Sequence, residues 1–257
     1  MKLYGKFFAM HLKSEMAYPM SFFMSCVGRL LTTASVLIGM VFLMDRFDAI
    51  GGYQLPEILL GYGVIVTGFA LAECFARGFD AFAKILRQAQ FDRLLVRPRS
   101  IVFQVICQDL RLASITNLLQ GIVMIVYGVL AGEILWTPVK ILVLISMAAC
   151  AGLLFFGLFL AYAALCFVTL EGLEVMNILT YGIREYSKYP FHIYGKGILL
   201  FLTCVVPMAL VQYWPMRYLM GTGPGWYGVL PLISLLFLLP CYGLWRLGLR
   251  HYTSTGS

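Results

Sequence analysis

The chain has 257 residues, of which 61% are hydrophobic and 12% are charged, and its mean hydropathy is +0.87. Soluble domains carry about 25% charged residues, so this composition excludes an ordinary soluble globule and indicates an integral membrane protein. The formal net charge of +7 would suit nucleic-acid binding in a soluble protein. Here the basic residues stand at the ends of apolar runs, where they orient membrane spans, and we expect no nucleic acid among the partners.

The first 20 residues have the pattern of a helix that lies on a membrane surface. Lysines are spaced among apolar residues, and Leu3, Phe7 and Met10 fall on one helical face. A helix with an apolar face and a basic face binds between lipid head groups and acyl chains. We therefore predict an amphipathic interfacial helix over residues 1–20.

Six apolar stretches follow, and each is long enough, or nearly so, to cross the hydrocarbon core, which takes about 20 helical residues. They are residues 22–44, 58–76, 107–130, 139–167, 198–213 and 226–249. The fifth is the shortest. The pattern predicts an all-α, polytopic membrane protein in contact with the lipid bilayer, with six transmembrane helices in a single domain, residues 1–257.

The connection between the second and third stretches, residues 77–100, is basic. It contains six lysines and arginines against two aspartates. Its apolar residues recur at helical spacing, at Phe79, Phe82, Ala83 and Leu86 and again at Phe91, Leu94 and Leu95. Pro98 then ends the helical pattern. We predict one or two short amphipathic helices on the cytoplasmic face; the alternative is that the basic residues only orient the flanking spans.

The stretch from residue 167 to 189 is half apolar and contains two glutamates, which leaves several placements open. It could be a surface helix, a re-entrant piece or the cytoplasmic end of the fourth span. We favour a cytoplasmic interfacial helix, because Arg184, Glu185 and Lys188 follow the apolar part.

The distribution of lysine and arginine predicts the orientation in the membrane. The connections on the side of the N-terminus carry 14 of these residues, and those on the other side carry three. Cytoplasmic loops are enriched in Lys and Arg, so we expect both termini in the cytoplasm. An even number of spans agrees with this expectation.

Polar residues inside the spans are costly, and insertion scales give about 2.5–3.5 kcal/mol for a charge at a helix centre. Arg29 either extends toward the cytoplasm or faces a polar path through the protein or a dimer seam. Asn117 and Gln120 line such a path or bond a neighbouring helix. Glu73 and Arg77 are four residues apart, which predicts a local ion pair.

The stretch FDRLLVRPRS, residues 91–100, resembles the G-x-L-D-x-x-L-x-R-P segment of type-2 ATP-binding-cassette permeases, in the branch that occurs as paired multidrug-type export permeases. The matching residues are Asp92, Leu95, Arg97 and Pro98. The usual Gly and Leu are replaced by Gln90 and Phe91.

Two further stretches are similar to the same branch. The residues that match its Y-P, I-P and Y-x-P positions are Tyr189, Pro190, Pro207, Tyr213, Pro215 and Gly221. The C-terminal WRLGLRHYTSTGS is similar to its W-x-x-G-L-x-x-Y-x-S-x-G ending. Together the three motifs extend the resemblance over nearly the whole chain.

The resemblance implies a permease subunit of an exporter in a bacterial inner membrane. It would form a translocation path with a second identical or related permease, and cytoplasmic ABC ATPase subunits would drive it. ATP and Mg²⁺ would bind to the ATPase, with no cofactor in this chain, which lacks G-x-x-x-x-G-K-[ST]. The residues that would couple to the ATPase are Phe79, Phe82, Leu86, Phe91, Asp92, Leu94, Leu95, Arg97 and Pro98. The implied cargo is amphiphilic or hydrophobic: a drug, a peptide or a lipid-like molecule.

A second hypothesis is an integral membrane enzyme that acts on lipid. Its candidate polar residues are Glu171, Glu174, Arg184 and Glu185. Acid–base chemistry also needs a nucleophile or a metal site, and the sequence offers neither in a recognisable pattern. A channel or scaffold without energy input is a third hypothesis, which a stable complex with a cytoplasmic ATPase would exclude.

Overall fold

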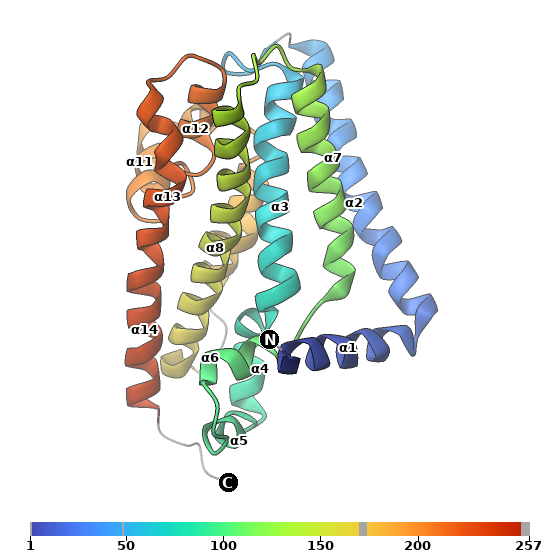
Figure 1. The fold of residues 1–257 in the computed structure, drawn as a ribbon, viewed down its shortest axis with the longest axis vertical. Helices are drawn as coiled ribbons and strands as arrows, with labels where there is room; N and C mark the ends of the chain where they lie inside the picture. The colour runs from blue at the N-terminus through green and yellow to red at the C-terminus, as the bar shows by residue number, and fades with distance from the viewer. Residues whose placement is uncertain (1, 48, 170–173, 253–257) are drawn as a thin grey trace.

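The computed structural model describes residues 2–47, 49–169 and 174–252, and within these residues it is helical apart from turns and one isolated bridge between Ile50 and Tyr53. Five helices in this part of the chain are long and apolar enough to cross a membrane, at residues 19–46, 55–87, 112–131, 138–169 and 225–251. Figure 1 shows them as a bundle, with helix α1 lying across its lower end. The prediction of an all-α membrane protein is confirmed to this extent.

In chain order, the first elements are α1 (Lys2–Met16), α2 (Pro19–Arg46), α3 (Leu55–Asp80), α4 (Phe82–Arg87), α5 (Phe91–Leu95) and α6 (Ile101–Ile106). Next come the 3₁₀ turn η1 (Leu112–Ser114), α7 (Ile115–Ala131), α8 (Pro138–Thr169), α9 (Glu174–Asn177), the π-helical η2 (Ile178–Gly182) and α10 (Ile183–Tyr186). The last are η3 (Phe191–Tyr194), α11 (Lys196–Cys204), α12 (Tyr213–Leu219), η4 (Gly225–Val229), α13 (Leu230–Ser234), η5 (Leu235–Phe237) and α14 (Leu238–His251). The third span thus starts at residue 112, because α6 is a separate helix.

Local sequence signals set the starts of the long helices. Pro19 begins α2 and Pro138 begins α8, where the missing proline N–H has no helical partner to lose. Helix α3 begins with a capping box, in which the Gln54 backbone N–H donates to the Glu57 carboxylate at 2.9 Å.

Helix α3 is the centre of the bundle, between α7 and α8 (Figure 1). Glycine lets these helices approach closely. A Cβ at Gly68 would lie 2.8 Å from the carbonyl carbon of Ala151 on α8, and a Cβ at Gly128 of α7 would lie 2.6 Å from the Cβ of Leu60. Membrane helices gain much of their association energy from such close packing of small residues.

Helix α2 is the outermost span and leaves most of its surface uncovered. In Figure 1, α2 and α7 run together at the upper end and diverge toward the lower end, where α1 turns back. Helix α1 is fastened there by a hydrogen bond between His11 Nε2 and the Cys107 carbonyl, 3.1 Å, and by the Leu112 N–H, which donates to Glu15 at 3.2 Å. The sequence predicts this N-terminal helix, and its location on a membrane surface stays a prediction.

The predicted fifth span, residues 198–213, is wrong as a continuous helix. Helix α11 ends at Cys204, and the chain folds back so that the Ala209 N–H donates to the Leu202 carbonyl at 2.8 Å. Helix α12 then runs from Tyr213 to Leu219, and the Trp214 ring N–H donates to the Thr203 hydroxyl at 3.4 Å; both short helices lie at the upper end of the bundle (Figure 1). Residues 198–213 therefore do not form a single helix long enough to cross a membrane.

The placement favoured for residues 167–189 is also wrong where the structure describes it. Residues 174–194, named here the rising segment, run along α3 from its lower end to its upper end. Tyr181 donates to Asp80 at 3.0 Å, near the end of α3, and its ring lies 5.2 Å from that of Phe69 at mid-helix. His192 lies beside Tyr53, just before α3 begins, with 6.1 Å between ring centroids. Glu171 lies outside the described residues.

The close approach at Gly68 gives a stability prediction. Gly68→Val should disrupt the contact between α3 and α8 and lower the free energy of unfolding by at least about 2 kcal/mol, because the neighbouring atoms are the Ala151 Cβ and the backbone of Ala151 and Gly152, which cannot rotate away. Gly39→Val is the matched control, because a Cβ at Gly39 of α2 meets nothing within 4 Å. Unfolding in mixed micelles measures both variants, and equal stabilities would contradict the packing described here.

Candidate functional site

The short helices α4, α5 and α6 form a compact projection at the lower end of the bundle, named here the elbow (residues 82–106; Figure 1). Its core is aromatic. The ring of Phe82 lies 5.3 Å from Phe91, 5.1 Å from Phe167 and 5.2 Å from Trp245. Phe91 also contacts Tyr252 at 4.9 Å, in an edge-to-face arrangement. Because Phe167 ends α8 and Trp245 belongs to α14, the elbow is fixed to three spans and not only to its own α3.

The structure divides the residues predicted to couple to an ATPase into two groups. Phe79, Phe82, Leu86, Phe91 and Leu94 are buried within the chain. They build the core of the elbow and have no surface left for a partner. Arg97 and Pro98 are exposed, Leu95 is 44% exposed, and Asp92 is half-buried.

The turn between α4 and α5 depends on Ala89. Its φ is +51°, which is left-handed, while Gln90 has an ordinary φ of −77°. The Gln90 N–H donates to the Ile85 carbonyl at 3.1 Å and the Ala89 N–H to the Leu86 carbonyl at 3.0 Å. This is the Schellman pattern, in which glycine usually occupies the left-handed position. The replacement of glycine by Gln90 in the motif therefore carries no backbone penalty; the strain lies at Ala89.

Two side chains missed by the sequence analysis hold the elbow in shape. Gln104 of α6 is buried, and its amide nitrogen lies 3.0 Å from the Leu94 carbonyl and 3.0 Å from the Arg99 carbonyl, so it joins the two sides of the turn. The Tyr252 hydroxyl donates to Asp92 at 2.9 Å. Burial and this hydrogen bond raise the pKa of Tyr252, which keeps the hydroxyl protonated as a donor.

The tip of the elbow consists of exposed apolar residues surrounded by arginines. Val96 is 86% exposed beside Leu95, and Arg93, Arg97 and Arg99 are all exposed around them. Exposed apolar residues rimmed by charge are typical of protein contact sites. The local sequence produces this arrangement because Leu94 and Leu95 are adjacent in α5 and cannot share one face, so that only Leu94 is buried.

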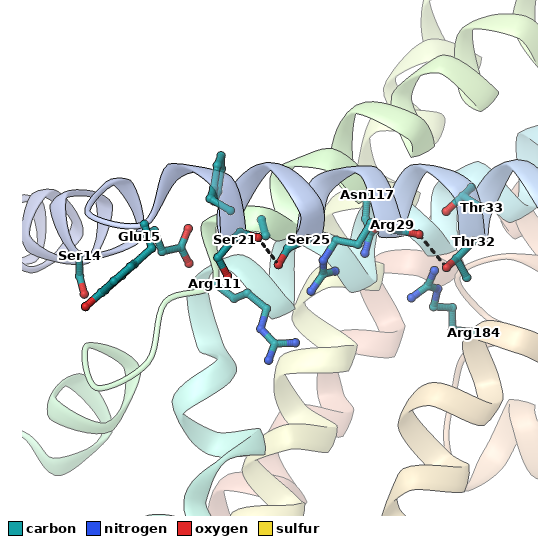
Figure 2. Close-up of a pocket in the computed structure, with 14 residues that line it drawn as sticks. Ser14, Glu15, Ser21, Ser25, Arg29, Thr32, Thr33, Arg111, Asn117 and Arg184 are labelled. Atoms are coloured by element: carbon teal, nitrogen blue, oxygen red, sulfur yellow. Dashed lines mark hydrogen bonds between the residues drawn. The ribbon is translucent and has the colours of Figure 1, made fainter.

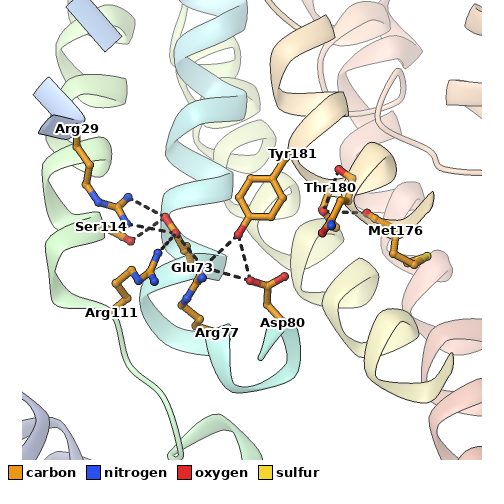
Figure 3. Close-up of polar contacts among 10 residues, drawn as sticks. Arg29, Glu73, Arg77, Asp80, Arg111, Ser114, Met176, Thr180 and Tyr181 are labelled. Atoms are coloured by element: carbon orange, nitrogen blue, oxygen red, sulfur yellow. Dashed lines mark hydrogen bonds and ion pairs between the residues drawn. The ribbon is translucent and has the colours of Figure 1, made fainter. Parts of the chain in front are cut away.

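A second polar site lies above the elbow, inside the bundle, around Glu73 of α3 (Figure 3). Glu73 is 3% exposed. Its carboxylate accepts from Arg29 at 3.1 Å, from Arg77 at 3.0 Å and from Ser114 at 2.7 Å, and it lies 3.4 Å from Arg111. The predicted pair with Arg77 is confirmed, and it is one part of a larger network.

Arg77 extends this network to the rising segment. It pairs with Asp80 at 3.2 Å and donates to the Tyr181 hydroxyl at 3.1 Å (Figure 3). A buried charge is tolerated in an apolar medium only when it is paired and hydrogen-bonded. The network therefore joins α2, α3, η1 and the rising segment at one level of the bundle.

The three polar residues predicted to line a path or a seam lie on one side of the bundle, between α2 and α7. Arg29 and Asn117 line a pocket there, together with Arg111 and Arg184 (Figure 2). Gln120 lines a neighbouring apolar groove. Arg29 is satisfied by Glu73 and not by solvent alone. No local sequence pattern indicated that Arg111 and Arg184 would join them.

The family model described as "ABC-2 family transporter protein" matches residues 30–256. The chain belongs to this family. Comparisons with curated proteins and with solved structures returned no match.

This ABC-2 family member is therefore a multi-pass membrane protein and a transport permease. The resemblance to type-2 ABC exporter permeases, stated from three short motifs, is confirmed by a match over most of the chain. Within the described residues, no three His, Cys, Asp or Glu side chains are placed to hold a metal ion. Of the residues considered for a lipid enzyme, Glu185 pairs with Lys188 at the surface while Arg184 points into the pocket.

Ala89 gives a stability prediction for the elbow of this permease. Ala89→Gly should raise the free energy of unfolding by about 0.5–1 kcal/mol, because glycine adopts the left-handed conformation without steric cost. Gln90→Gly is the control and should not stabilise, because its backbone is already unstrained. Unfolding in mixed micelles is the measurement, and a stabilised Gln90→Gly with an unchanged Ala89→Gly would contradict this turn geometry.

Glu73 gives a second stability prediction. Glu73→Gln leaves Arg29, Arg77 and Arg111 facing an amide, and we expect unfolding to become easier by about 3 kcal/mol or more, because the buried guanidinium groups lose their shared counter-charge. Glu57→Gln on the same helix is the control, since an amide still accepts in a capping box. Unfolding in mixed micelles again measures both variants. A Glu73→Gln variant as stable as the wild type would show that the network adds no stability.

Proposed function

We propose that this chain is one permease subunit of an ATP-binding-cassette exporter, and that its elbow receives the movement of a cytoplasmic ATPase. The observation that carries the proposal is the tip at Leu95 and Val96, which is exposed and apolar but held on a buried aromatic core. An element that transmits force needs both a contact surface and a stiff connection to the spans. ATP and Mg²⁺ would bind to the ATPase subunit and not to this chain.

A sixth crossing, made by the rising segment, supports the proposed topology. The elbow, α1 and the end of α14 lie at one end of the bundle (Figure 1). Five crossings would leave α1 and the end of α14 on opposite faces of the membrane, and the rising segment along α3 supplies the crossing that an even number requires. The basic residues of the elbow favour the cytoplasm for this end, with both termini cytoplasmic in a bacterial inner membrane.

The irregular backbone of the rising segment supports a second permease, identical or related. Non-helical backbone at membrane depth is tolerated only where protein covers it or it lines a water-filled cavity. The rising segment contains a π-helix and a 3₁₀ turn, yet Ile178 and Tyr186 are exposed on its outer side. An apolar groove of about 230 Å³ lies there between the rising segment and α11. We assign this face to the second permease, with the path between the two subunits.

The proposed cargo is amphiphilic or hydrophobic, and the proposed direction is export. Both rest on the resemblance to multidrug-type export permeases. The arginine-lined pocket between α2 and α7 supports an amphiphilic cargo, since Leu30 of a neighbouring apolar groove is one helical turn from Thr33 of the pocket.

The tip of the elbow provides the test. Leu95→Glu combined with Val96→Glu places two carboxylates where apolar contact with the ATPase is expected. We expect the ATPase that co-purifies with the wild-type chain in mild detergent to be lost or weakened by at least about tenfold, because burying one unpaired charge already costs more than 1.4 kcal/mol. ATP-dependent transport should fall with it, and membrane insertion should not change.

Val168→Glu is the matched control, because Val168 is an exposed valine at the same end of the bundle but outside the elbow. This variant should keep the ATPase. If the double variant retains both the ATPase and transport, the elbow is not the coupling element. If no ATPase accompanies the wild-type chain, the exporter assignment fails.

A further inference from the structure

A pocket of about 590 Å³ lies in the wedge where α2 separates from α7, beside the turn between α1 and α2. Figure 2 shows three arginines reaching into it from different elements: Arg29 from α2, Arg111 from the chain before η1, and Arg184 from α10. The Arg111 side chain is more exposed than that of Arg29, and all three arginines are partly buried. Elements far apart in the sequence thus bring like charges together.

The charges of this pocket do not balance. Arg29 and Arg111 share the Glu73 carboxylate, and Glu15 lines the pocket from α1. Burial raises the pKa of Glu15, which weakens it as a counter-charge. Among the described residues Arg184 makes no ion pair; its guanidinium lies 5.2 Å from the Phe69 ring and hydrogen-bonds with Tyr62, and its buried Nε has no hydrogen-bond partner there. The described lining of the pocket therefore sets three guanidinium groups against one carboxylate, that of Glu15, while Glu73 is also shared with Arg77.

The pocket wall also offers hydroxyl and amide groups. Its polar lining includes Ser21, Ser25, Thr32, Thr33 and Asn117. Ser25 and Thr32 donate to the carbonyls four residues earlier, as hydroxyls in membrane helices do. Thr33 does not: it is 2% exposed, and its Oγ1 has no hydrogen-bond partner among the described residues. A buried hydroxyl left without a partner is costly unless a ligand completes its bonding.

An apolar groove of about 480 Å³ continues along the same two helices toward the upper end of the bundle. Its lining residues are Leu30, Leu37, Thr116, Leu119, Gln120, Val123 and Met124. On α2 the pocket is lined as far as Thr33, and the groove is lined by Leu30 and Leu37. Leu30 and Thr33 are three residues apart, so the two cavities are neighbours across one turn of α2.

We propose that this composite site binds an amphiphile with a singly charged anionic head and an alkyl tail, and that this molecule is the cargo. The head would lie between Arg29, Arg111 and Arg184, and the tail in the apolar groove. The inference deepens the proposed function and rests on it. With α1 and the elbow on the cytoplasmic side, the head points to that side and the tail to the bilayer midplane, as in an amphiphile of the cytoplasmic leaflet.

The depth of Arg184 favours an anion over a neutral or cationic head. Arg184 sits at the level of Phe69, close to the middle of α3, where an arginine without a counter-charge is expensive. Arginine binds phosphate, sulfonate and carboxylate groups in planar, two-pronged geometry. One anion would complete the charge balance of the pocket and satisfy Arg184 and Thr33 together. A cation would add a further positive charge to three arginines.

The experiment uses the wild-type permease with its ATPase in phosphatidylcholine nanodiscs. Three probes share a twelve-carbon tail and differ in the head: dodecanesulfonate (anionic), dodecyl glucoside (neutral) and dodecyltrimethylammonium (cationic). Binding is followed by scintillation proximity with radiolabelled dodecanesulfonate, competed by the others, and ATPase stimulation is recorded in parallel. We expect dodecanesulfonate to bind at least about tenfold more tightly than either of the others, as a charge-assisted hydrogen bond predicts, and to stimulate hydrolysis.

Variants locate the site. Arg184→Gln should weaken dodecanesulfonate binding by about tenfold, whereas Arg46→Gln, an exposed arginine at the far end of α2, should not. Val123→Trp should fill the groove and weaken binding by about tenfold, whereas Ile122→Trp on the neighbouring face of α7 should not. Equal effects of a variant and its control would overturn the site.

Two further measurements complete the experiment. One distinguishes a transported cargo from a resident membrane lipid, and the other distinguishes failure of this inference from failure of the exporter assignment. If phosphatidylglycerol in the nanodisc displaces dodecanesulfonate completely, or if dodecanesulfonate binds without stimulating the wild-type ATPase, the site holds a resident lipid and the cargo proposal is wrong. The double variant at Leu95 and Val96 should keep binding and lose stimulation. If wild-type binding is absent while that variant still loses the ATPase, the exporter assignment stands and this inference falls.

Discussion

The carboxylate of Glu73 is the constraint on which the arrangement of this permease depends. A charge inside a spanning helix must be neutralised where it stands, because moving it to water would take the helix out of the membrane. Glu73 is neutralised by ion pairs with Arg29, Arg77 and Arg111, and it also accepts a hydrogen bond from Ser114. These residues come from three separate elements, so one buried group fixes the level at which α2, α3 and η1 meet. The wedge between α2 and α7 begins at this level.

The same network touches the elbow through the backbone of α3. The helix departs from helical geometry at Ala76, between Glu73 and Arg77, and the Glu73–Arg77 ion pair crosses this bend. Below the bend, Gly78 lies against the backbone of Val105 in α6 so closely that no side chain would fit. The aromatic contacts of Phe82 and Phe91 then join α3 to the ends of α8 and α14. A displacement of the elbow would therefore move three spans together and bend α3 at Ala76.

Much of this organisation could be predicted from local patterns. Apolar length identified five of the spans, and the 3.6-residue spacing of Phe79, Phe82 and Leu86 identified the helix that covers the elbow core. The same spacing could not show whether the apolar face contacts a partner or the rest of the chain, because an amphipathic pattern does not identify what packs on the apolar face. The contacts that decided the matter, from Phe167 and Trp245, come from residues far along the sequence.

The two errors on the C-terminal side have one physical cause. Residues 198–213 are apolar enough for a span, but hydropathy does not distinguish a spanning helix from a hairpin packed in protein. Residues 174–194 are too polar for a lipid-facing span, yet they pack along α3, where Tyr181 donates to Asp80 and the Arg184 guanidinium lies over the Phe69 ring. A segment surrounded by protein need not be apolar. Scales built on transfer into lipid therefore do not reveal how either segment is packed.

The pocket and the elbow are close enough to be coupled through Glu73 during the proposed transport. Arg29 and Arg111 line the pocket and also share Glu73, and Glu73 stands about two and a half helical turns before the start of the elbow. An anion that draws these arginines toward itself would weaken their hold on Glu73 and leave Arg77 to keep the bend of α3. A movement of the elbow would act on the same ion pairs from the other side. Occupancy of the pocket and position of the elbow then bias one common element, which is the condition for coupling between two sites.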